Sequence, residues 1–115
     1  MKLVLHDIWA LEAVKGEEID LNKYNKHPNL EINLTTSSVL GNDSCNNFFG
    51  DLKTVDNNRL AFNALAGTKM ACPNITLSNA IKKALAETQA YKIENLKLLL
   101  YNTKGEELLR YKKVD

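Results

Sequence analysis

The sequence is poor in arginine, carries almost no net charge and contains no long apolar run. Only Arg59 and Arg110 among its fifteen basic residues are arginine, and the formal net charge is +1. Arginine is the usual reader of guanine edges, and nucleic-acid binding depends on many cations. We therefore expect no nucleic-acid partner. Apolar runs stay far below the roughly 20 residues that cross a bilayer, so we also expect no direct membrane span.

The N-terminal apolar stretch is short as well. Residues 3–5 are followed by His6 and Asp7, whereas the apolar region of a signal peptide needs about 7–15 residues. We therefore expect either a cytosolic protein or an exported one whose signal segment is absent from this chain.

Length and patterning indicate one domain, residues 1–115, with an α+β fold dominated by strands. Strict alternation over residues 30–34 is typical of a half-buried strand. Comparable patterns predict strands at residues 8–14, 39–41, 51–55, 59–65, 91–101 and 107–112, a loop over 15–28, and hairpin turns at 56–58 and at 102–105, where Gly105 supplies a positive φ.

One segment, residues 76–88, has the period of an amphipathic helix. Leu77, Ile81 and Ala84 fall on one face, and Thr76 is the expected N-cap. Six or seven short strands and one helix predict a strongly bent, barrel-like antiparallel sheet with the helix covering one opening.

Two segments form the most specific pattern in the chain. The first is Gly41-x-x-x-Cys45-Asn46-x-Phe48-x-Gly50, and the second runs from Leu65 through Thr68, Lys69 and Met70 to Cys72-Pro73. With Trp9-x-Leu11 near the start and Tyr91-x-Ile93-x-x-Leu96-x-Leu98 followed by Gly105 near the end, this pattern resembles the META domain, or HslJ-like, family. The resemblance runs from about Ile8 to Tyr111. The family usually has Gly where this chain has Ser44, and Arg where it has Lys69.

The resemblance implies a bacterial envelope protein, periplasmic or an outer-membrane lipoprotein, linked to heat stress, antibiotic tolerance or motility. A lipid anchor would then belong to the precursor. The family brings no catalytic residue, cofactor or metal, so its motif positions are expected to be structural: Trp9, Gly41, Asn46, Gly50, Thr68 and Met70. We accordingly expect a monomeric, non-enzymatic domain that binds an unknown envelope protein or supports stress tolerance.

The two cysteines have three interpretations. Cys45 and Cys72 lie in the two loops that the motif pairs, so they form either a disulfide or a structural thiol pair. As metal ligands they lack a C-x-x-C spacing, and only His6 and His27 could join them. As a nucleophile, Cys45 would need an activated thiolate, and only Lys69 nearby is basic. A disulfide would indicate an oxidising compartment.

Other candidates have a structural and a functional interpretation. Asn46 either caps a turn or donates to an oxyanion, and Asp43 and Asp51 are either turn residues or a carboxylate pair. Phe48 and Met70 are expected to fill the core, and Trp9 to anchor it unless its exposure marks a binding face.

Two alternative functions remain open. A small-ligand or lipid carrier would use the interior of the bent sheet, provided that this interior is incompletely filled. A cysteine hydrolase would use Cys45 as its nucleophile and would require a free thiol.

Overall fold

The computed structural model describes residues 5–20, 27–73 and 75–114. Within them one helix, α1 (Thr76–Glu87), lies between seven strands that precede it and three that follow it. The strands are β1 (Ile8–Val14), β2 (Glu17–Glu18), β3 (Asn29–Asn33), β4 (Ser38–Asn42), β5 (Asn47–Val55), β6 (Leu60–Phe62), β7 (Ala66–Gly67), β8 (Ala90–Glu94), β9 (Lys97–Tyr101) and β10 (Glu107–Lys113).

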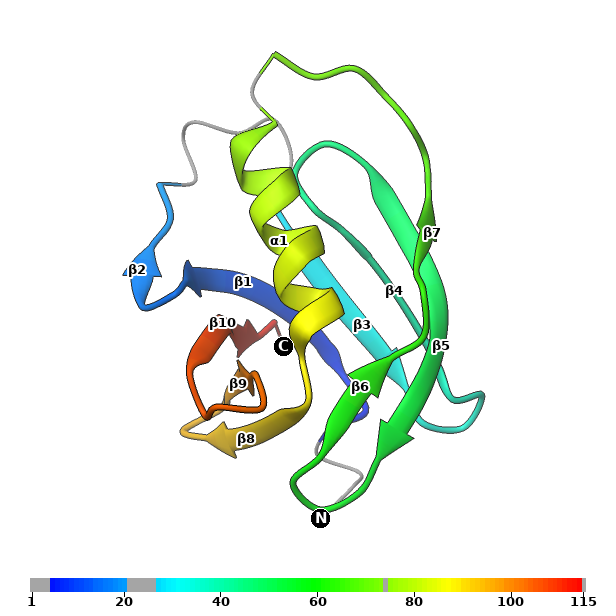
Figure 1. Cartoon of the computed structure of the whole chain (residues 1–115), viewed down its shortest axis with the longest axis vertical. Coiled ribbons are helices and arrows are strands. Elements are labelled where there is room, and N and C mark those ends of the chain that lie inside the picture. Colours follow the sequence, from blue (N-terminus) through cyan, green and yellow to red (C-terminus); the bar gives the residue numbers. More distant parts are fainter. Residues whose placement is uncertain (1–4, 21–26, 74, 115) are drawn as a thin grey trace.

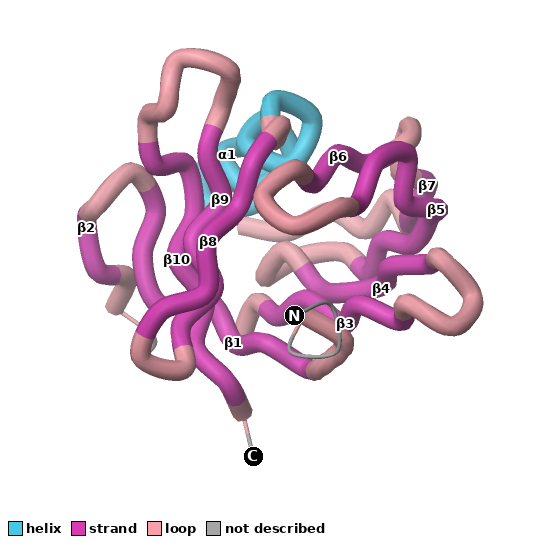
Figure 2. Tube along the Cα trace, turned by 90° about the horizontal axis from the view of Figure 1, so that it is seen from below, coloured by secondary structure: helices cyan, strands magenta, loops and turns pink. Residues whose placement is uncertain are grey.

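All the strand pairs are antiparallel, in the order β6-β5-β4-β3-β1-β10-β9-β8, with β2 added to β1 and β7 added to β5. The sheet curls until its end strands meet: Arg59 bridges to Ala90, and the N–H of Tyr91 donates to the carbonyl of Asn58 over 3.1 Å. Figure 1 shows α1 lying along this curled sheet. Figure 2, a view from below, shows the strands curving around with α1 on one side. The barrel-like α+β class predicted from the sequence is confirmed, with more strands than expected.

The core lies inside the curled sheet and under α1. Trp9 and Tyr111 are its largest fully buried side chains, and the Trp9 indole N–H donates to the carbonyl of Leu5 over 3.2 Å. The helix contributes the face predicted from its period, with Leu77, Ile81, Ala84 and Leu85 buried. Thr76 is the first helical residue rather than the N-cap, because Ile75 takes that position without a side-chain cap. No helix in the described ranges is long and apolar enough to cross a membrane.

The predicted single strand over residues 91–101 is wrong. The structure has two strands, β8 and β9, joined at Asn95 and Leu96, whose φ angles are 53° and 62°. Two successive positive φ angles make a type I′ hairpin turn, which propensity does not predict when the second residue is leucine. The hairpin turn at residues 102–105 was predicted correctly, and Gly105 there has a φ of 81°.

Three further boundaries differ from the sequence prediction. β5 begins at Asn47, four residues earlier than expected, because the irregular segment around Cys45 is only a short turn. The predicted strand at 59–65 ends at Phe62, after which the chain is largely exposed until β7. The predicted loop over 15–28 contains β2, and residues 21–26 of it lie outside the described part.

Candidate functional site

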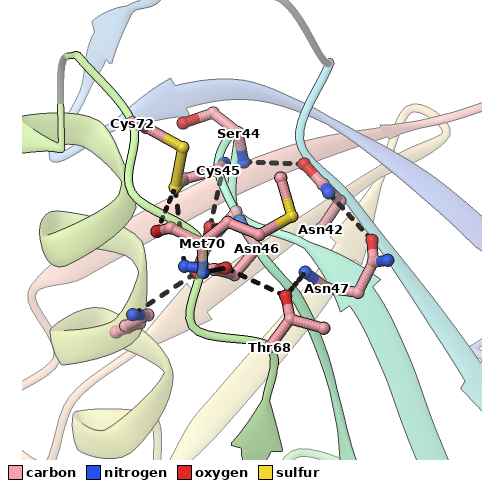
Figure 3. Close-up of polar contacts among 10 residues, drawn as sticks. Asn42, Ser44, Cys45, Asn46, Asn47, Thr68, Met70 and Cys72 are labelled. Carbon is pink, nitrogen blue, oxygen red and sulfur yellow. Dashed lines mark hydrogen bonds and ion pairs between the residues drawn. A yellow bond between two sulfur atoms is a disulfide. The ribbon is translucent and has the colours of Figure 1, made fainter.

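The turn before β5 and the segment after β7 are joined by a disulfide. Cys45 and Cys72 lie 27 positions apart in the sequence. Their Cα atoms are 6.0 Å from one another, and their sulfurs are covalently bonded. The disulfide implied by the family resemblance is therefore present (Figure 3). In this form neither sulfur is a thiolate, which a nucleophile or a metal ligand would have to be.

Asn46 joins the same two segments through hydrogen bonds. Its Oδ1 accepts from the Thr68 hydroxyl over 2.9 Å and from the backbone N–H of Met70 over 2.6 Å. The Thr68 hydroxyl also accepts from the N–H of Asn47 over 3.1 Å. Figure 3 shows these contacts beside the disulfide. The Asn46 side chain thus links the turn before β5 to the segment after β7.

Met70 does not fill the core, contrary to expectation. Its side chain is 52% exposed, whereas Phe48 is buried as predicted. What Met70 contributes to the linkage is its backbone N–H, which any residue except proline could supply. The Met70 side chain therefore does not have the core-filling role that the sequence predicted.

Asp43 holds the turn that precedes β5. Its Oδ1 accepts from the N–H groups of Cys45 and Asn46 over 3.1 and 2.7 Å. The side chain is fully buried, yet Oδ2 has no hydrogen-bond partner, and its nearest cation is Lys82 on α1, with Nζ 4.0 Å away. The alternative of a carboxylate pair with Asp51 is not supported, because Asp51 is exposed in β5 while Asp43 is buried. No sequence signal distinguished Asp43 from an ordinary turn aspartate.

The Asp43 carboxylate also affects the core. Burial, assisted by the nearby charge of Asp43, raises the pKa of Tyr111. Tyr111 is completely buried and its hydroxyl has no hydrogen-bond partner within the described residues. Its phenol is therefore neutral at physiological pH.

Two positions near the disulfide favour glycine for different reasons: Ser44 because of its backbone conformation, and Gly41 because of the atoms packed against it. Ser44 has a φ of 83°, in the left-handed region that glycine enters freely, so the departure from the family's Gly leaves a serine in a glycine conformation. A Cβ at Gly41 would collide with the Asn29 carbonyl oxygen and lie 2.6 Å from Phe48 Cζ. Gly41 is thus required by the close approach of β3 and of the Phe48 ring.

A cleft of about 500 Å³ opens between α1 and the exposed segment around β7. Its apolar wall consists of Phe48, Phe62 and Leu65 from the strand side and Leu85 and Ala86 from the helix. Its charged lining residues, within the described part of the chain, are Asp43, Lys69 and Lys82. Asn46 and Thr68 also line it, so the hydrogen bonds that link the two segments form part of its wall.

The cysteines and motif residues predicted from the sequence lie in two places, beside the cleft and in the core. Cys45, Asn46, Thr68, Met70 and Cys72 come together beside the cleft. Gly50 packs against Leu65 of the cleft wall, because a Cβ there would come 2.7 Å from Leu65 Cδ2. Trp9 lies in the core at 1% exposure and presents no binding face.

Comparison with known families matches residues 2–115 to the META domain. The chain belongs to the META domain family. No significantly similar relative is found among curated proteins.

Solved structures share the fold of this META domain. An NMR structure aligns with a TM-score of 0.73 at 25% identity, covering 97% of this chain and 92% of that one. An NMR structure of a protein from Burkholderia xenovorans aligns at 0.76 with 20% identity, covering 98% and 85%. A crystal structure of a DUF4847 family protein from Bacteroides vulgatus aligns at 0.63 with 13% identity, covering 99% and 98%. The last two likenesses concern the fold alone.

Proposed function

We propose that this META domain is a non-enzymatic binding domain of the bacterial envelope, with the cleft between α1 and β7 as its binding site. The observation that carries the proposal is the cleft itself, whose volume of about 500 Å³ falls within the range of ligand sites. Its walls combine apolar side chains with a few polar groups, which is the usual composition of such sites.

The linkage of the two segments supports a binding role, because it fixes one wall of the cleft in advance. The disulfide and the bonds of Asn46 hold the segment that follows β7 against the turn before β5. A wall that is already ordered loses little conformational entropy when a ligand arrives.

The disulfide also supports an extracytoplasmic location. Disulfides persist in the periplasm and outside the cell but are rare in the cytosol. With Cys45 bonded, a hydrolase that needs its free thiol loses its nucleophile, and a non-enzymatic role accounts for the same residues without further chemistry.

A small amphiphile is the second candidate for the bound molecule, and the size of the cleft favours it. The carrier that the sequence left open as an alternative would use the interior of the sheet, but Trp9, Tyr111 and their buried neighbours pack there. A carried molecule would therefore occupy the cleft, with its apolar part against Phe62 and Leu65.

The test is saturable binding of the fluorescent probe 8-anilinonaphthalene-1-sulfonate to the full chain. Ala86→Trp places an indole in the cleft from an exposed helical position, whereas Glu87→Trp changes a neighbouring exposed residue outside it. We expect Ala86→Trp to abolish probe binding and Glu87→Trp to retain it, with both variants melting near the parent temperature. Absent binding, or equal binding by both variants, would contradict the proposal.

A further inference from the structure

β7 leaves one of its edges without a strand partner in the described part of the chain. Its register with β5 places Gly67 opposite Phe48 and Ala66 opposite Phe49. The N–H of Thr68 donates to the carbonyl of Asn47 over 3.0 Å, so Thr68 directs its backbone toward β5. Backbone groups of alternate residues in an antiparallel strand point to opposite edges. Those of Gly67 therefore point away from β5.

The free edge forms one wall of the cleft. Leu65, Ala66 and Gly67 all line it, and the opposite wall is α1, which presents side chains because its backbone groups are bonded within the helix. The cleft therefore offers an unpaired strand edge next to an apolar surface made by Phe48, Phe62 and Leu85. A strand edge beside pockets for alternate side chains is the arrangement that binds peptides by strand addition.

The charges of the cleft favour a partner with an acidic group. Lys82 faces Asp43 across 4.0 Å, so these two charges offset one another. Lys69, two residues beyond Gly67, is then the remaining charged side chain among the described lining residues. It places a positive charge at one end of the free edge.

We propose that the cleft binds an extended segment of a partner protein as a strand added along β7. The segment carries apolar side chains at alternate positions, which contact Phe48, Phe62 and Leu85, and an acidic residue at the end that lies beside Lys69. This inference rests on the proposed function and adds the class of partner and the mode of binding.

The test uses the full chain and a pool of synthetic seven-residue peptides. Alternate positions are drawn from Val, Leu and Phe, and the intervening ones are Thr. Asp is the first residue in half of the pool and the last residue in the other half, so that it can lie beside Lys69 in either strand direction. Amide hydrogen exchange measured by NMR should slow by about tenfold or more at Gly67 when a bound peptide is saturating. Exchange at Ala66 and Thr68 should not change, because these residues already face β5.

Matched peptides and variants sharpen this test. N-methylation of alternate peptide amides should abolish binding in one set of positions and leave it intact in the other, because only one edge of the added strand faces β7. Lys69→Ala should weaken binding of the acidic peptide by about fivefold relative to Lys53→Ala, an exposed lysine of β5 outside the cleft.

Two results would overturn the inference. One is that no peptide in the pool binds with a Kd below about 1 mM. The other is binding that leaves amide exchange at Gly67 unchanged. If the fluorescent probe still binds in an Ala86-dependent way, only strand addition is wrong; if probe and peptides both fail, the proposed function is wrong as well.

Discussion

Lys82 on α1 is the cation nearest to Asp43, with its Nζ 4.0 Å from the buried Oδ2 of that carboxylate. Oδ2 has no hydrogen bond, so the ammonium group is its main compensation within the described residues. The contact joins the helix to the turn that carries Cys45. An exposed helical lysine thereby stabilises a buried charge on another element.

Removing the Lys82 side chain should therefore destabilise the domain. The helical period places Lys82 on a solvent face, where truncation would change the free energy of unfolding by less than about 0.5 kcal/mol. The structure changes this expectation to a loss of about 1 kcal/mol or more for Lys82→Ala, because a buried charge loses its partner. Urea unfolding beside Lys83→Ala, an exposed neighbour, measures the difference. Equal stability of the two variants would show that the 4.0 Å contact contributes nothing.

Reduction of the disulfide should lower stability by about 3.6 kcal/mol, according to the chain-entropy relation for cysteines 27 positions apart. In a domain of this size the melting temperature should fall by roughly 15–25 °C. Calorimetry with and without reductant measures this fall, and the Cys45→Ser, Cys72→Ser double variant should reproduce it without reductant. Alkylation of the native protein followed by mass spectrometry should label neither cysteine. Labelled thiols together with an unchanged melting temperature would contradict both the bond and the compartment that it supports.

Ser44→Gly should stabilise the protein. Ser44 has a φ of 83°, where a side chain costs about 1 kcal/mol and glycine does not, although the more flexible unfolded chain offsets part of the gain. We expect a net gain of about 0.5 kcal/mol by chemical denaturation.

Gly105→Ala is the matched opposite of that substitution. Gly105 has a φ of 81° and open space around its Cβ position, so backbone strain alone should lower stability by about 1 kcal/mol. The same sign of change at Ser44→Gly and Gly105→Ala would contradict the assigned backbone conformations.

Glu12 should make stability depend on acidity. Its Oε1 accepts from Lys97 Nζ over 2.9 Å and from Arg110 Nε over 2.7 Å. The hydrogen bond from Lys97, followed by that from Arg110, holds the pKa of Glu12 below its ordinary value, although desolvation opposes this shift. A carboxylate with a lowered pKa stabilises the fold above its unfolded pKa, and this contribution is lost as the pH falls through its folded pKa.

Glu12→Gln should therefore cost about 1 kcal/mol at pH 7, and the cost should diminish below about pH 4.5 as the parent glutamate becomes protonated. Denaturation of both proteins between pH 3 and pH 8 measures this change. Glu31→Gln, at a half-buried position of β3, is the control. A Glu12→Gln cost that stays constant down to pH 3 would show that the ion pairs are not its source.

Patterns with a fixed period predicted most of the fold. Residues 30–34 alternate and form β3, and the stripe through Leu77 and Ile81 forms the buried face of α1. The β8–β9 turn escaped prediction because nothing in Asn95-Leu96 indicates left-handed backbone at leucine. That conformation is imposed by the pairing of the flanking strands, which a local pattern does not contain.

The candidate site was predictable only where residue chemistry is distinctive. The paired motif brought together Cys45, Asn46, Thr68 and Cys72, but it left Met70 in the core, where the structure does not put it. Burial of Asp43 and the free edge at Gly67 depend on how segments far apart in the sequence pack and pair. Such tertiary placement has no signature in composition or spacing, so the cleft emerges only from the assembled fold.

The position of β1 between β3 and β10 has a consequence for synthesis of the chain. Of its two neighbours, β3 follows β1 closely in the chain, whereas β10 is synthesised only after α1, β8 and β9. The Cys45–Cys72 bond encloses only residues that emerge well before β10. Oxidation can therefore precede completion of the sheet, and a covalent loop would then be in place before the slow, long-range pairing of β1 with β10 has formed.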